Sequence, residues 1–272
     1  MPTFHTSEPI TAVVEVVAGA VRLAATDRDD IVVDIKPRDP ERASDVRAAE
    51  QARVDFHNGT LTVTAGRKVL SLGRGGAVRV DIALPTGSRL NLSSASADID
   101  ADGVYSDCRC ATAGGAVRVA KITGNIKADS ASGDVSIGAV AGDARIATAS
   151  GDASIDRADG DVRFQAASGS LVIGTLRGQV KHQAASGSVR VGVGISGALS
   201  AQTGSGEVEV GIPEGTAARL ELKTHSGTVD NGLQASDGPA DGDETFMVHA
   251  RTGSGDISVR RAVGPVSADQ SS

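Results

Sequence analysis

A glycine recurs every nine residues through the middle of the chain, and this spacing constrains the fold more than any other feature. Apolar residues stand two and four positions after each glycine with mostly polar residues between them, which is the alternation of a half-buried strand. A corner rich in Ala, Ser and Thr completes the unit. The series comprises Gly115, Gly124, Gly133, Gly142, Gly151, Gly160, Gly169, Gly178 and Gly187.

Every second unit opens with a Ser-Gly pair, so the larger period is 18 residues, as between Ser132 and Ser150. Self-similarity at a fixed short period predicts a solenoid. We therefore expect an all-β fold, a parallel β-solenoid with two strands per 18-residue coil. Residues 18 apart should stack about 4.8 Å from one another. The predicted inward columns are Val119, Ile137, Ile155, Ile173, Val191; Val117, Val135, Ala153, Leu171, Val189; Ile126, Ala144, Val162, Val180; and Ala128, Ile146, Phe164, His182.

The corners predict a second set of columns. Alanines recur at Ala131, Ala149, Ala167 and Ala185, and we expect only small side chains to fit where the chain turns. The repeat glycines are expected to supply backbone angles that other residues adopt at a cost. Ala167→Leu should then destabilise the protein by overpacking.

The flanking segments predict the domain organisation. Residues 1–90 read as a β-rich N-terminal capping region continuous with the solenoid, with one short helix over residues 44–53 and a possible N-cap at Ser44. Residues 91–262 form the predicted solenoid, interrupted by a polar loop near 234–245. Residues 263–272 are predicted to be a disordered tail.

Three motifs carry a family resemblance. They are the repeated Ser-Gly-Asp-φ-x-φ coils (φ being apolar), the Leu-Pro-x-Gly-x-x-φ-x-φ segment from Leu84 to Leu92, and the closing Ser-Gly-Asp-Ile-Ser-Val from Ser254 to Val259. Nearly the whole chain resembles the DUF4097 putative-adhesin, or toast-rack, family of bacterial β-solenoids. The resemblance implies a non-enzymatic, adhesin-like β-strand-repeat protein connected with cell-envelope stress systems.

A row of cations is the main candidate for a binding site. The residues are 18 apart and alternate outward, so they should form a stripe on one sheet that binds a polyanion or an acidic partner. Asp143 and Asp161 lie beside the row and would partly neutralise it, which favours the alternative of ordinary surface charge. The predicted stripe consists of Lys127, Arg145, Arg163 and Lys181.

Other candidate groups have structural explanations. Asp134 and Asp152 follow repeat glycines, but the second glycine and the correctly placed aspartate of calcium-binding nonapeptide rolls are missing. We expect these carboxylates to be solvated and to bond corner backbone. His182 is predicted to stack on Phe164 in the core rather than to bind a metal, and Cys108 and Cys110 are predicted to pack rather than to form a disulfide. No catalytic residues and no cofactor are predicted.

Charge and composition restrict the partners. A formal net charge of −7 and a pI near 5.2 argue against nucleic acid and anionic membranes. No apolar run approaches the ~20 residues of a membrane span, and no signal-peptide pattern opens the sequence. The expected location is cytoplasmic.

Three functions remain open at this point. The leading hypothesis is a rigid, non-enzymatic scaffold or binding module for an unidentified macromolecule, either a protein or an acidic polymer. The alternative is a self-assembling filament or homo-oligomer formed by end-to-end or face packing. A polysaccharide-acting β-helix enzyme is a distant third.

Overall fold

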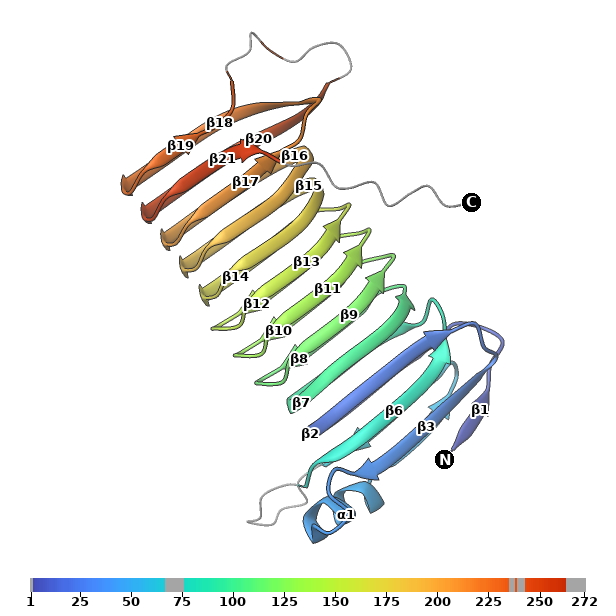
Figure 1. Cartoon of the computed structure of the whole chain (residues 1–272). Coiled ribbons are helices and arrows are strands. Elements are labelled where there is room, and N and C mark those ends of the chain that lie inside the picture. Colours follow the sequence, from blue (N-terminus) through green and yellow to red (C-terminus); the bar gives the residue numbers. More distant parts are fainter. Residues whose placement is uncertain (1, 67–75, 235–237, 239–242, 263–272) are drawn as a thin grey trace.

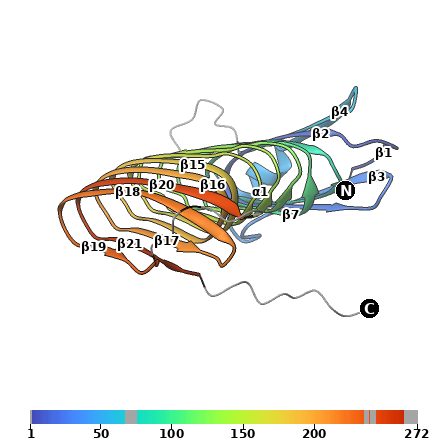
Figure 2. The same cartoon turned by 90° about the horizontal axis from the view of Figure 1, so that it is seen from above.

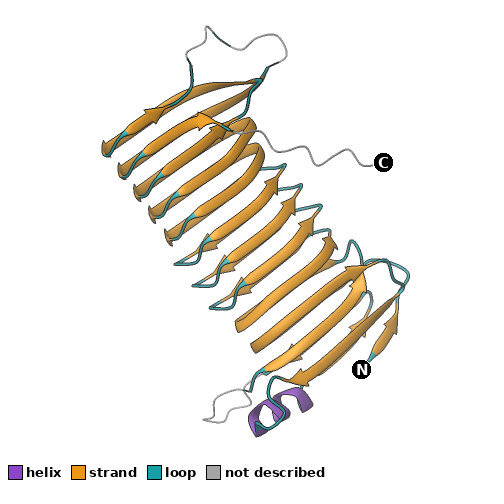
Figure 3. Ribbon diagram, viewed as in Figure 1, coloured by secondary structure: helices purple, strands orange, loops and turns teal. Residues whose placement is uncertain are grey.

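The computed structural model describes residues 2–66, 76–234, 238 and 243–262. Within these residues, strands lie side by side as successive rungs, and one short helix sits near the N-terminal end (Figures 1 and 3). Residues 18 apart pair in parallel register, as Val117 does with Val135 and Ile126 with Ala144. The predicted parallel β-solenoid with two strands per 18-residue coil is confirmed.

Each coil contributes one strand to each of two walls, here named wall A and wall B, and Figure 2 shows the coils as flattened loops. Four long strands bend through a corner and belong to both walls: β2 (Thr11–Thr26), β7 (Arg89–Tyr105), β15 (Leu171–Ser186) and β16 (Val189–Ser205). In the centre, wall A consists of β8 (Cys108–Thr112), β10 (Ile126–Ser130), β12 (Ala144–Thr148) and β14 (Val162–Ser168). Wall B consists there of β9 (Val117–Ile122), β11 (Val135–Val140) and β13 (Ala153–Ala158).

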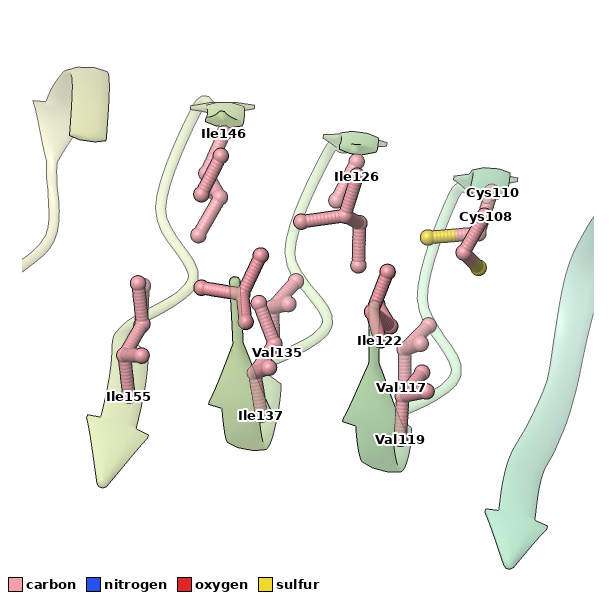
Figure 4. Packing of buried hydrophobic residues seen from close by; sticks show 14 of the residues in the cluster. Cys108, Cys110, Val117, Val119, Ile122, Ile126, Val135, Ile137, Ile146 and Ile155 are labelled. Carbon is pink, nitrogen blue, oxygen red and sulfur yellow. The ribbon is translucent and has the colours of Figure 1, made fainter. Parts of the chain in front are cut away.

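The core fills the space between the walls, where aliphatic side chains from both sides meet (Figure 4). Every member of the predicted inward columns is at most 2% exposed. A further inward column stands seven residues after alternate repeat glycines and was not predicted. It comprises Ile122, Val140, Ala158 and Leu176.

The corners differ from the prediction, because the alternation of the wall A strands continues into them. Residues two before the corner alanines point outward, and so do the alanines themselves: Ala167 is exposed. In two coils the inward position between them, Ser130 or Thr148, carries a hydroxyl that bonds the glycine three residues on, whereas Ala166 and Ala184 occupy this position in the next two coils. Thr148 Oγ1 accepts from the Gly151 N–H at 2.7 Å, and Ser130 Oγ donates to the Gly133 carbonyl at 2.7 Å. The expectation that only small side chains fit at the alanine positions is wrong.

The glycine that follows is where size is limited. A Cβ added to Gly151 would lie 2.3 Å from the Gly133 carbonyl oxygen, and one added to Gly133 would lie 2.0 Å from that of Gly115. Neither Gly133 nor Gly151 has a positive φ. Close approach between stacked coils, rather than an unusual backbone angle, therefore requires glycine at these two positions.

The N-terminal end contains a coil that is out of sequence order. β2 lies between the coil formed by β5 (Thr60–Ala65) and β6 (Val78–Pro85) and the coil formed by β7. Antiparallel strands then cover the outermost coil: β4 (Arg53–His57) pairs with β5, β3 (Asp30–Pro37) pairs with β6, and β1 (Thr3–His5) pairs with β3. Residues 1–90 thus supply two coils as well as the cover.

The helix α1 (Ala43–Glu50) packs against β3 and β6 at this end. Its N-cap is Arg42, without a side-chain capping bond, so the predicted cap at Ser44 is wrong. Ser44 lies inside the helix, and its Oγ donates to Asp45 Oδ1. Asp45 is 2% exposed and accepts the backbone N–H of Ala77 at 3.0 Å, a bond that lowers the pKa of this carboxyl and ties the helix to the chain before β6.

The C-terminal end repeats the exchange of order. After β17 (Val208–Ile212), the chain forms the outermost coil with β18 (Thr216–Ser226) and β19 (Val229–Asn231). It then returns as β20 (Glu244–Ser254) and β21 (Ile257–Arg261), which lie between β16–β17 and β18–β19. The predicted loop at 234–245 lies mostly outside the described residues, and the predicted tail at 263–272 lies wholly outside them.

Candidate functional site

Five cations stand in register on the outer surface of wall A. All five are exposed, and each is paired with the next across adjacent parallel strands, about 4.8 Å apart. Four of them are the predicted stripe, and the fifth, Arg109, extends it by one coil. The cation column, as we name it, comprises Arg109, Lys127, Arg145, Arg163 and Lys181.

Arg109 was missed by sequence reasoning although the signal was present. It stands 18 residues before Lys127, and its neighbours Cys108 and Cys110 alternate inward as an apolar pair would. One more step back along the period finds it.

Aspartates neutralise the column unevenly. Lys127 Nζ lies 3.0 Å from Asp129 Oδ2, and Arg145 Nη2 lies 3.4 Å from Asp143 Oδ2. Asp161 was expected to act in the same way on its neighbour, but its Oδ1 accepts the backbone N–H of Gln179 at 3.1 Å and it forms no ion pair with Arg163 among the described residues. The aspartate ion pairs therefore fall on the middle of the column, at Lys127 and Arg145.

Within the part of the chain that the structure describes, three members of the column form no ion pair. Two of them, Arg163 and Lys181, are adjacent in the stack. The residues two before and two after Lys181 are Gln179 and Gln183, both uncharged. Arg163 and Lys181 are thus neighbouring cations that form no ion pair with a carboxylate of the described residues.

A second polar column runs beside these cations. Gln165, Gln183 and Gln202 are in register, and Gln165 Nε2 donates to Gln183 Oε1 at 3.3 Å. Gln183 and Gln202 line a shallow depression of about 630 Å³. Arg251 and small residues such as Gly204 complete its lining. Unlike the charged residues, the amides can both donate and accept hydrogen bonds.

Glu221 forms an ion pair with Arg251, one of the residues that line the depression. This carboxylate lies 3.0 Å from His249 Nδ1, 3.4 Å from Arg251 Nη2 and 3.4 Å from Lys223 Nζ. The bond to His249 is the main cause that lowers the pKa of Glu221. The ion pair with Arg251 links this lining residue on β20 to β18.

The corner carboxylates bond backbone, as the sequence suggested. Asp134 Oδ1 accepts the N–H of Asp152 at 2.9 Å, and Asp152 Oδ1 accepts the N–H of Ser170 at 2.7 Å. Each carboxylate thereby satisfies a corner amide of the next coil. Among the described residues, no group of three or more His, Cys, Asp or Glu side chains is arranged to hold a metal ion.

The buried polar groups also lie where they were predicted. His182 is fully buried and stacks on Phe164 with ring centroids 5.4 Å apart, and neither ring nitrogen has a hydrogen-bond partner. Burial lowers the pKa of His182 to about 4. Cys108 and Cys110 are buried and free, and the pKa of the Cys108 thiol is raised by its hydrogen bond with Cys110 and by burial.

A comparison with protein families identifies the family of the chain. A family model described as Toastrack DUF4097 matches residues 13–260. The chain belongs to this Toastrack family. No helix in the described part of this Toastrack chain is long and apolar enough to cross a membrane.

The solved structures that match this Toastrack chain share little sequence with it. A putative adhesin from Bacteroides fragilis is 11% identical, with 95% of each chain covered and a TM-score of 0.40. A putative lipid binding protein from Parabacteroides distasonis is 15% identical, with 94% of this chain and 95% of that chain covered and a TM-score of 0.42. A search of curated proteins finds no match.

Proposed function

We propose that this Toastrack protein is a non-enzymatic binding module that holds an extended acidic polymer along wall A. The observation that supports the proposal is the cation column: five successive coils each place one exposed cation in the same register. A straight row of charges about 4.8 Å apart suits a linear ligand with repeated anionic groups better than a rounded protein surface.

The neighbouring amides extend the same ligand preference. Gln183 and Gln202 beside the cations offer donors and acceptors to the hydroxyl groups of a polymer that carries both carboxylates and hydroxyls. The net charge of −7 repels a polyanion at long range, so contact with the column has to be short-ranged. At physiological ionic strength the Debye length is about 8 Å, which confines the repulsion to that range.

Charge reversal within the column tests the proposal. In titrations followed by calorimetry, polygalacturonate should bind the protein, neutral dextran should not, and added salt should weaken the binding. Arg163→Glu with Lys181→Glu should weaken the affinity for polygalacturonate by about tenfold or more.

The matched control is Arg118→Glu with Lys121→Glu. These residues are exposed on wall B, and the double variant changes the net charge by the same amount. Its affinity should stay close to that of the unmodified protein. Equal losses in the two double variants, or no binding of polygalacturonate at low salt, would refute wall A as the binding surface.

A further inference from the structure

The C-terminal end of the solenoid leaves a long strand edge open. Among the described residues, β18 pairs with β20 alone and β19 pairs with β21 alone. β18 is 11 residues long. An edge strand presents a row of unpaired N–H and C=O groups to which another strand can add. The edge is therefore competent to extend wall A.

The apolar columns of the core also run out at this end. Leu199 and Val248 are 0% exposed, but Leu220, the next member of their column, is only partly buried. In wall B, Ile257 is 0% exposed and is followed by Val229 at 47%. Covering these side chains would stabilise the end, because removing apolar surface from water is favourable.

The outward-facing charges of β18 indicate which strand is complementary to this edge. Arg219, Glu221 and Lys223 alternate in sign along the strand. If a second β18 pairs antiparallel about Leu222, Glu221 of each copy faces Lys223 of the other copy. If it pairs about Leu220, Arg219 faces Glu221 twice. Opposite charges directly across an antiparallel pair are favourable, so the strand is complementary to itself.

We propose that the occupant of this edge is a second copy of the chain. A two-fold axis perpendicular to the walls places β18 antiparallel to the partner's β18, so that wall A continues into wall A of the partner and wall B into wall B. The contact is isologous and closes after two copies. The N-terminal end is covered by β3, β4 and α1, so the product is a dimer rather than a filament.

A pair of edge variants with a rescue tests the proposal. Arg219→Glu with Lys223→Glu makes the outer face of β18 wholly acidic, and Glu221→Lys makes it wholly basic. Each variant alone places like charges opposite each other, so its homodimer should be weaker than the wild-type dimer by about tenfold. An equimolar mixture should form the heterodimer with at least the wild-type affinity. Sedimentation equilibrium of the full chain measures all of these, and thermal melts establish that each variant is folded.

Arg53→Glu on β4 is the control, because it changes one charge at the opposite end and should leave dimerisation unaltered. Three outcomes would overturn the proposal: a wild-type chain that is monomeric at every accessible concentration, homodimers of the edge variants as tight as the wild type, or open-ended growth beyond two copies.

Discussion

The two ends of the solenoid each contain a coil that is out of sequence order, but they differ in what covers the outermost coil. At the N-terminal end, β2 lies between the β5–β6 coil and β7. At the C-terminal end, β20–β21 lies between β16–β17 and β18–β19. The same inward column of wall A starts at Leu61 and ends at Leu220. Leu61 lies beneath β4 and is 0% exposed, whereas Leu220 has no strand beyond it among the described residues and is partly exposed.

This difference shows that a terminal leucine is buried by its cover and not by its position in the repeat. Three antiparallel strands and a helix protect the N-terminal coil, and the outermost strands there are short, with five residues in β4 and three in β1. The edge at the other end has 11 residues. Long exposed edges invite pairing, so the chain has one end closed to association and one end suited to it.

Truncation of the two terminal leucines should give the largest contrast. Leu61→Ala removes a fully buried side chain and should lower the free energy of unfolding by about 3 kcal/mol. Leu220→Ala removes a partly exposed one and should cost about 1 kcal/mol. Urea denaturation at low protein concentration measures both. Equal costs would mean that the ends are equally covered.

His182, which is buried in the core between the two ends, should make the stability of the protein depend on pH. The pKa of His182 is about 4 in the folded protein, below its ordinary value of 6.5. A lowered histidine pKa means that protons bind the unfolded chain first, so stability is complete above pH 6.5 and falls as the pH drops toward 4. The contribution lost by pH 5 is about 2 kcal/mol. Urea midpoints across this pH range measure it.

His182→Leu is the control for that slope. It should remove the His182 contribution to the pH dependence and raise stability at neutral pH by about 1 kcal/mol, because both ring nitrogens of the histidine are buried without partners. An unchanged slope would show that water or another group reaches the ring.

In the corners of the central coils, substitution of a repeat glycine should destabilise the protein much more than substitution of a corner alanine. Gly151→Ala forces a Cβ to 2.3 Å from the Gly133 carbonyl oxygen and should cost about 2 kcal/mol. Ala167→Leu places a larger side chain on an exposed corner and should change stability by less than about 0.5 kcal/mol. Melting temperatures of the two variants decide this, and a large loss for Ala167→Leu would restore the rejected view of the corner.

The smallest expected contrast compares the cover with the open end. Phe56 in β4 packs against Phe4 with ring centroids 5.4 Å apart. Phe56→Ala should destabilise the protein by about 1.5 kcal/mol, whereas Val229→Ala, at 47% exposed, should cost less than about 0.5 kcal/mol at low protein concentration. Similar costs in urea denaturation would indicate that β4 does not stabilise its end.

The repeat made the central fold predictable, because the 18-residue spacing alone identifies Val119 and Ile155 as the stacked neighbours of Ile137. The same arithmetic places the cation column. The exchanged coils could not be predicted, since β2 and β7 pair across 78 residues with no shared period, as between Thr11 and Arg89. The prediction for the corner was wrong for a local reason. The strand alternation extends one step further than the repeat pattern indicated, so Ala167 points outward.

Amide hydrogen exchange of β5 and β18 at two protein concentrations tests most directly whether one end is covered and the other open to a second copy. In dilute protein, the β5 amides should be protected like those of the central coils, and the amides of β18 should exchange far faster. In concentrated protein, β18 should become protected while β5 stays unchanged. Strong protection of β18 at every concentration, or rapid exchange of β5, would contradict the account.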